Sequence, residues 1–335
     1  MTDRDAPGFE PPPYPYDRLD AFQKIAAQFD GGVVDLSIGT PCDPPPQAVI
    51  DALSNSNSER GYPASIGSEA LRRSIARWMG RRFAIDVPVS RIAACIGTKE
   101  FVATTPQYMK LRRPNRDTVI YPSVAYPTYE MGAILAGLRA LPVPMNAEGH
   151  MDFASIAQSD IDRALMVWVN SPSNPTGGLD DLKYAADWGR RNNVPVFSDE
   201  CYTEFTWSTS SQSILQHGLD GVIAVHSLSK RSNLAGVRVG FYAGDAEIVE
   251  RCDLARGMPR EREREFLLAD AAAVVADFDE LRAAGRELHD NVMRAGVETV
   301  FEEFLERRGG TLDDFARSDL IDQKIGQHLN GHGRL

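Results

Sequence analysis

From residue 91 onward, short apolar runs recur along the chain at regular intervals. There are five of them, at 91–96, 118–121, 164–169, 194–197 and 222–225. Helix-length amphipathic stretches, such as 99–111 and 180–191, lie between several of the runs. Continuous apolar runs of this length are typical of strands that are buried on both faces. Strands that alternate with helices predict an α/β fold with a mainly parallel central sheet.

The ends of the chain have a different character. Residues 1–18 are proline-rich and predict an extended arm, and the apolar run at 33–38 ends at Gly39. Three prolines at 44–46 precede a helical pattern, and a further helix is predicted from Ser68 to about Arg82. Residues 251–335 hold 31 charged residues out of 85 and predict charged helices without a strand, at 261–284, 286–306 and 312–329.

Charge and composition exclude several classes of partner. The 36 basic and 47 acidic residues give a net charge of −11, which disfavours both nucleic acid and anionic membrane surfaces. No uncharged apolar run approaches the length of a membrane span, and the acidic N-terminus lacks an apolar signal core, so we expect a cytoplasmic protein. The four cysteines and six histidines are dispersed, which predicts reduced thiols and no metal centre.

Polar motifs follow four of the five apolar runs directly. They are GTKE at 97–100, NSPSNPTG at 170–177, SDECY at 198–202 and HSLSK at 226–230. Parallel α/β sheets bind ligands beyond the carboxyl ends of their strands. The sequence therefore predicts that these four motifs meet around one ligand site.

Lys230 has the surroundings of a reactive lysine. It follows an apolar run, Ser227 and Ser229 lie beside it in sequence, and Arg238 is eight residues further on. A lysine taken alone is most often a solvated surface charge. A lysine at a strand end, among hydroxyls and near an arginine, suits a Schiff base to an aldehyde next to a bound phosphate.

The other motifs leave a structural and a functional interpretation open. Asn174 lies in a sequence typical of turns, but it also places an amide at the end of a strand. Asp199 is either a helix cap or a fixed negative charge that keeps a proton on a heterocyclic nitrogen. The glycine turn at 97–100 could bind phosphate at a helix N-terminus. Tyr126 is either a core aromatic residue or one that stacks on a flat ring.

Together and in this order, the motifs resemble those of the class I/II pyridoxal-phosphate-dependent aminotransferases, the aspartate aminotransferase superfamily. The resemblance covers residues 14–250 and rests on VDLSIGTP, GYPASIGSEALR, SVAYPTYEMGA, NSPSNPTG, SDECY and HSLSKRSNLAGVRVGF. Within that family the sequence is most similar to actinobacterial succinyldiaminopimelate aminotransferases. The resemblance implies the PLP-dependent transferase fold, with a seven-stranded, mainly parallel sheet, and pyridoxal 5′-phosphate (PLP) as the cofactor.

The resemblance also implies roles for individual residues. Lys230 matches the lysine that binds the cofactor aldehyde and moves a proton, and Asp199 matches the carboxylate that pairs with the pyridine nitrogen. Asn174 and Tyr202 match donors to the phenolic oxygen of the ring, and Tyr126 matches the stacking aromatic residue. The residues that match the phosphate-binding set are Thr98, Lys99, Ser227 and Arg238.

A homodimer is implied as well, because Tyr62 matches a tyrosine that reaches the phosphate of the neighbouring subunit. Gly39 matches a backbone position near the substrate carboxylate. We expect an N-terminal arm and small-domain part at 1–43, a large PLP-binding domain at 44–245 and an atypical helical segment at 246–335.

The activity implied is amino transfer (EC 2.6.1.-) from an amino acid, with glutamate as the expected donor, to a keto acid, in succinyldiaminopimelate and lysine biosynthesis. Members of the family carry an arginine for the substrate α-carboxylate in a C-terminal small domain. From residue 251 this sequence departs from that pattern, and we assign no arginine to the role. A PLP-dependent lyase or decarboxylase, and a PLP-binding pseudoenzyme with a degraded substrate site, remain alternatives.

Overall fold

The computed structural model describes residues 19–32, 39, 43–56, 64–207 and 209–257. Described residues 46–56 belong to one compact unit, and the others belong to a second, larger unit. The smaller unit contributes helix α2, Gln47–Ser54, where the proline-led helix is predicted. The predicted arm at 1–18, the apolar run at 33–38 and the three predicted helices beyond residue 260 lie outside the described residues.

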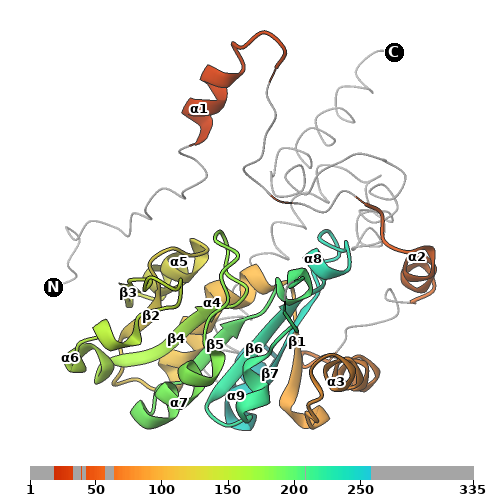
Figure 1. Ribbon diagram of the computed structural model, residues 1–335. Helices are drawn as coiled ribbons and strands as arrows, with labels where there is room; N and C mark the ends of the chain where they lie inside the picture. The colour runs from red at the N-terminus through yellow and green to blue at the C-terminus, as the bar shows by residue number, and fades with distance from the viewer. Residues whose placement is uncertain (1–18, 33–38, 40–42, 57–63, 208, 258–335) are drawn as a thin grey trace, which may run out of the picture. The chain divides into compact units, whose positions relative to one another are not determined.

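A seven-stranded sheet forms the centre of the larger unit, with the strand order β1-β7-β6-β5-β4-β2-β3 (Figure 1). Strands β2 to β6 are parallel to one another, whereas β7 runs antiparallel to both β1 and β6. The predicted α/β fold with a mainly parallel sheet is therefore confirmed. The strands are β1 Ile92–Cys95, β2 Thr118–Pro122, β3 Arg139–Val143, β4 Ala164–Asn170, β5 Val196–Asp199, β6 Val222–Ser227 and β7 Gly240–Gly244.

Helices cover both faces of the sheet and bury two separate apolar clusters. Helices α3 and α7 pack on one face, where Met79 and Trp188 join the inward side chains of the strands. Helices α4, α5 and α9 cover the other face, where Phe101 and Tyr129 are fully buried. The helices of this unit are α1 Leu19–Ala26, α3 Glu69–Phe83, α4 Thr98–Arg112, α5 Thr128–Leu135, α6 Gln158–Ile161, α7 Leu182–Asn192, α8 Leu228–Arg231 and α9 Ala246–Gly257.

Alternation along the strands decides which face each side chain of the site meets. Phe197 belongs to the cluster under α4 and α5, so Asp199, two residues later, points to that same face. Glu200 and His226 lie on the opposite face, the side of α3.

Within the described ranges, no helix is both long and apolar enough to cross a membrane, and no group of three or more His, Cys, Asp or Glu is placed to hold a metal ion.

Candidate active site

Asp199 ends strand β5 and is buried, with 6% of its surface exposed. Its Oδ2 accepts a hydrogen bond of 2.8 Å from the hydroxyl of Tyr129, and its Oδ1 accepts one of 3.2 Å from the backbone N–H of Cys201. Burial raises the pKa of the Asp199 carboxyl, although both donors oppose that shift. Among the ion pairs of the described residues, none joins Asp199 to a lysine or an arginine. The site therefore offers a carboxylate to a cationic partner.

Lys230 lies on α8, the short helix that follows β6. Because β5 and β6 are adjacent and parallel, α8 begins at the same edge of the sheet as Asp199. Partial burial lowers the pKa of the Lys230 ammonium. Its Nζ donates a hydrogen bond to the backbone carbonyl of Gly39, so the structure brings together two residues that are remote in sequence.

The N-terminus of α4 and Arg238 meet at Gly97. Gly97 has φ 73°, and a Cβ at this position would lie 2.9 Å from Cζ of Arg238, so any side chain here would displace the guanidinium. Arg238 itself has φ 54° and donates from Nη1 to the carbonyl of Ala235 at 2.8 Å. Its guanidinium is thereby held beside a helix N-terminus, and both groups favour an anion.

Thr98 and Ser227 belong to the same corner of the site. Ser227 pairs with Gly240 in the β6–β7 register, and a Cβ at Gly240 would lie 3.0 Å from Cγ2 of Thr98. The thiol of Cys201 donates to Oγ1 of Thr98 at 3.4 Å, which ties the end of β5 to the start of α4. The Ser227 hydroxyl accepts from the N–H of Ser229 at 3.0 Å. Lys99 follows Thr98 in the first turn of α4 and is exposed.

Asn174 and Tyr202 are also in contact, so both could donate to the same ring oxygen. Nδ2 of Asn174 donates to the hydroxyl of Tyr202 at 3.2 Å. Tyr126 is half-buried, and its ring stands edge-on to that of Tyr129, with ring centroids 5.9 Å apart. Tyr129 also donates a hydrogen bond to Asp199, so Tyr129 lies between Tyr126 and the carboxylate and contacts both.

Two residues that hold this arrangement together are absent from the sequence predictions. Tyr129 is one, and Asn170 is the other. Nδ2 of Asn170 donates to the carbonyl of Asp199 at 2.9 Å, while its Oδ1 accepts from the N–H of Asn174 at 2.7 Å. Asn170 thus connects the ends of β4 and β5. Its position as the first residue of NSPSNPTG was the available signal. Tyr62 lies outside the described residues.

The donor set fits PLP. A buried carboxylate suits a protonated ring nitrogen, while a guanidinium, hydroxyls and a helix N-terminus suit a phosphate dianion. An amine of lowered pKa suits an aldehyde. The arrangement at Gly97 supports a phosphate site, because the guanidinium of Arg238 occupies the space that a side chain at this position would fill.

A family profile and several known proteins match this chain. The profile of the family "Aminotransferase class I and II" matches residues 31–296. The 4-dedimethylamino-4-oxo-anhydrotetracycline transaminase OxyQ of Streptomyces rimosus is 37% identical over 72% of this chain and 66% of its own length. The LL-diaminopimelate aminotransferase of Aquifex aeolicus is 35% identical over 71% of this chain and 64% of its own.

A solved structure resembles the fold closely. The probable N-succinyldiaminopimelate aminotransferase of Thermus thermophilus has a TM-score of 0.65 and 29% identity, over 72% of this chain and 67% of that one. The fold is that of PLP-dependent aminotransferases. The chain belongs to the class I and II aminotransferase family, as the motifs predicted, and PLP is the cofactor of that family. It spans about two thirds of the length of these curated relatives.

Proposed function

We propose that this chain transfers an amino group from an amino acid, with glutamate as the expected donor, to a keto acid. The observation that carries the proposal is Asp199. Its buried carboxylate is aimed by two hydrogen-bond donors, pairs with no lysine or arginine of the described chain, and lies at the sheet edge where α8 presents Lys230.

Lys230 and Asp199 divide the chemistry between them. When bound, PLP supplies an aldehyde and a pyridine ring that accepts electrons. Lys230 would hold the aldehyde carbon through Nζ, with loss of water, and would carry a proton at the substrate Cα. Burial favours this role, because the lowered pKa of Lys230 increases the fraction of uncharged amine at neutral pH. Asp199 keeps the proton on the ring nitrogen, and the positive charge of that nitrogen in turn favours the ionised carboxylate.

The remaining residues hold and orient the cofactor. Its phosphate is bound by Arg238, Ser227 and the start of α4 at Thr98 and Lys99. Supporting this assignment, Gly97 leaves room for the Arg238 guanidinium at the helix N-terminus. Asn174 and Tyr202, whose polar groups are in mutual contact, would donate to the phenolic oxygen of the ring. Tyr126 stacks on the ring.

Substrate and assembly follow from the resemblance rather than from the described geometry. Gly39 lies near the substrate carboxylate, which is consistent with its contact to Lys230. Tyr62 reaches the phosphate of a neighbouring subunit in a homodimer. We also propose the division into 1–43, 44–245 and 246–335, a cytoplasmic location and a succinyldiaminopimelate-type acceptor. The name of the Thermus thermophilus structure supports the last of these, whereas OxyQ is named for a different substrate.

Absorption spectroscopy tests the proposal. Protein treated with PLP is recorded in the near-ultraviolet and visible range before and after excess L-glutamate. We expect the band of the lysine-bound cofactor to give way to the band of its amine form. The Lys230→Ala variant should lack that response, while Lys183→Ala, which removes a surface lysine paired with Asp187, should retain it.

Other outcomes separate the alternatives. A bound cofactor whose spectrum responds to no amino acid contradicts amino transfer and indicates a pseudoenzyme. Release of pyruvate or carbon dioxide without a keto acid acceptor indicates a lyase or a decarboxylase. A Lys230→Ala variant that binds PLP and absorbs like the parent contradicts the assignment of the lysine.

A further inference from the structure

Three residues assigned to the cofactor have charged or titratable neighbours in sequence that lie on the other side of the sheet. Glu200 follows Asp199, His226 precedes Ser227 and Arg231 follows Lys230. Strand alternation turns His226 away from Ser227, and Glu200 lies against His226. His226 and Arg231 both contact Trp78 of α3, so these neighbours lie on the side of α3. There they are linked to one another.

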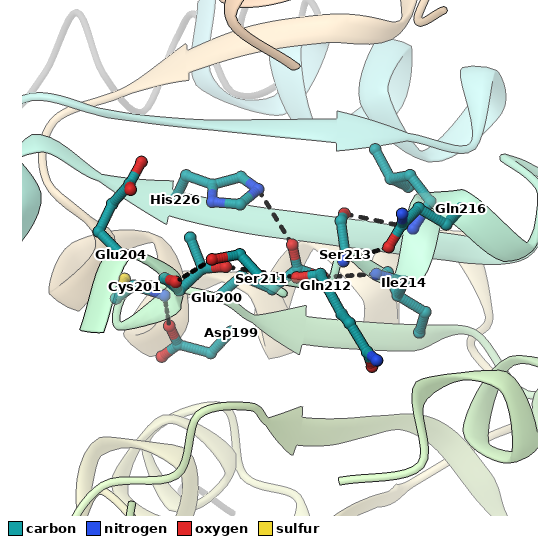
Figure 2. Close-up of polar contacts among 12 residues, drawn as sticks. Asp199, Glu200, Cys201, Glu204, Ser211, Gln212, Ser213, Ile214, Gln216 and His226 are labelled. Carbon is teal, nitrogen blue, oxygen red and sulfur yellow. Dashed lines mark hydrogen bonds and ion pairs between the residues drawn. The ribbon is translucent and has the colours of Figure 1, made fainter. Parts of the chain in front are cut away.

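Glu200 and His226 form the centre of this arrangement (Figure 2). Their side chains are 0% and 1% exposed, and Oε2 of Glu200 lies 3.1 Å from Nε2 of His226, at ion-pair distance. The other carboxylate oxygen, Oε1, accepts a hydrogen bond of 2.7 Å from the backbone N–H of Ile214. Neither Nδ1 nor Nε2 of His226, nor Oε2 of Glu200, has a hydrogen-bond partner within the described chain, so the pair is a contact at ion-pair distance without hydrogen-bond geometry.

Aromatic rings surround the imidazole and exclude water from it. Phe241 stacks on His226 with centroids 5.0 Å apart, and Phe83 does so at 5.9 Å. Trp78, on α3, meets the imidazole edge-on at 5.1 Å. The carboxylate and the imidazole are therefore held in a buried enclosure lined by aromatic rings.

Trp78 also connects Glu200 and His226 to helix α8, which carries Lys230. The guanidinium carbon of Arg231 lies 4.1 Å from the centroid of its ring, a cation–π contact. Nε of Arg231 lies 3.5 Å from Oε1 of Glu204, and the other carboxylate oxygen of Glu204, Oε2, lies 3.0 Å from Nη2 of Arg82. Glu204 is four residues after Glu200, so both carboxylates of this set of contacts come from the segment 200–204.

A buried pair of this kind is poorly explained by stability alone. Desolvation of the two groups offsets much or all of their attraction, and apolar side chains of similar size often do equally well. What a fixed pair does supply is position, because it tolerates only one relative placement of the strands that carry it. In this chain those strands carry Asp199 and Ser227, and the linked helix carries Lys230.

We propose that the rear network, defined as Glu200, His226, Trp78, Arg231 and Glu204, sets the spacing between Asp199 and Lys230. Its members are positioning residues that never contact the cofactor. They act through the strand ends and helix α8, on which the proposed function depends. Disturbing the network therefore misplaces Asp199 and Lys230 and weakens cofactor binding. This loss of affinity is larger than a loss of fold stability alone would cause.

The experiment uses the full chain and two variants from opposite ends of the network. Glu200→Gln keeps the size of the side chain and an acceptor for Ile214 but removes the charge facing His226. Arg231→Met keeps the length of the stem and removes the contacts to Trp78 and Glu204. Arg91→Lys is the control, since Arg91 forms an exposed ion pair with Asp220 and lies in the turn that precedes β1.

For each protein, the PLP dissociation constant, the visible circular dichroism of the bound cofactor and the melting temperature of the cofactor-free form are measured. We expect the dissociation constant to rise about tenfold in Glu200→Gln and about fivefold in Arg231→Met. The visible dichroism should change in both variants, and Arg91→Lys should match the parent. If Glu200→Gln does not fold, Arg231→Met alone tests the proposal. Its side chain is 19% exposed, so its replacement disturbs the core less.

Two results overturn the proposal in different ways. Variants that melt lower without PLP, but whose dissociation constant stays within twofold of the parent with an unchanged spectrum, show a purely structural role and refute the network alone. A parent protein that binds no PLP refutes the proposed function, and the network proposal with it.

Discussion

The hydroxyl of Tyr129, on α5, donates a hydrogen bond of 2.8 Å to Oδ2 of Asp199 at the end of β5. Tyr129 is fully buried and stacks on Trp168, with ring centroids 5.3 Å apart. It therefore has little freedom to turn, and the carboxylate that it holds is equally fixed. Burial and the neighbouring Asp199 raise the pKa of Tyr129 well above its usual value, so the phenol remains a donor at any working pH.

Replacing Tyr129 with phenylalanine removes this donor without removing the ring. We expect Tyr129→Phe to lose about 1 kcal/mol of unfolding free energy and to bind PLP about three- to tenfold more weakly, because the carboxylate loses a partner that favours its ionised form. Equilibrium urea unfolding and PLP titration measure the two effects. Tyr184→Phe, at a half-exposed ring, should change neither. Unchanged PLP affinity in Tyr129→Phe would show that the hydrogen bond does not support the site.

A methyl group at Gly97 tests the contact with Arg238. Gly97→Ala places a Cβ against the guanidinium, whereas Gly137→Ala, at a similar φ of 66°, meets nothing within 4 Å. Both variants should lose about 1 kcal/mol or more of stability to the positive φ. Only Gly97→Ala should lose PLP affinity, by tenfold or more, as measured by equilibrium dialysis. Equal losses of affinity in the two variants would contradict the phosphate assignment of Arg238.

Asp180 gives the protein a pH-dependent stability. Burial raises the pKa of its carboxyl to about 6, whereas an aspartate in an unfolded chain titrates near pH 4. Between these values the native protein holds a proton that the unfolded chain has released, so the unfolding free energy falls as pH rises. The contribution lost between pH 4 and 7 is about 3 kcal/mol at most.

The Asp180→Asn variant should lack this dependence. Its Oδ1 still accepts from the N–H of Asp181, as the carboxylate does at 3.0 Å. Urea unfolding at several pH values should show the variant gaining stability relative to the parent as pH rises from 4 to 7. A difference between the two proteins that is constant over this range would show that the Asp180 carboxyl titrates normally.

The Cys201 thiol should be unreactive while the protein is folded. Burial and the nearby Asp199 raise the pKa of this thiol well above its usual value, and alkylation requires the thiolate. We expect iodoacetamide at pH 7.5 to leave Cys201 unmodified in buffer and to modify it in urea, as read by peptide mass spectrometry. Rapid labelling of folded protein would contradict the buried placement of the thiol.

Sequence patterns predicted five of the seven strands of the central sheet. The five apolar runs coincide with β1, β2, β4, β5 and β6, and the helix predicted from Ser68 is α3, with the Ser68 side chain capping its N-terminus. Strands β2, β4, β5 and β6 lie inside the sheet and are buried along their whole length, so their sequences are continuously apolar, and the edge strand β1 is buried at three of its four residues. The residue ranges of β3 and β7 were not predicted. Strand β3 lies at the edge of the sheet and is largely accessible, and β7 is bounded by glycines with no β-branched residue.

The site was predicted less completely, for a related reason. Motif order identified residues that follow strands, but a contact such as Asn170 with Asp199 depends on which strands are neighbours. The same holds for Glu200 and His226, which come from adjacent strands 26 positions apart in sequence. Nothing in either motif signals that these side chains meet on the face opposite the proposed cofactor site.

The most direct test of the account is to find where the cofactor attaches. Protein incubated with PLP is treated with sodium borohydride, which reduces the lysine–cofactor bond to a stable amine, and is then digested and analysed by mass spectrometry. The assignment of the aldehyde to Lys230 predicts one modified position, Nζ of Lys230, and no modification of that peptide in Lys230→Arg. Attachment at another lysine, such as Lys99, or no stable attachment at all, would contradict it.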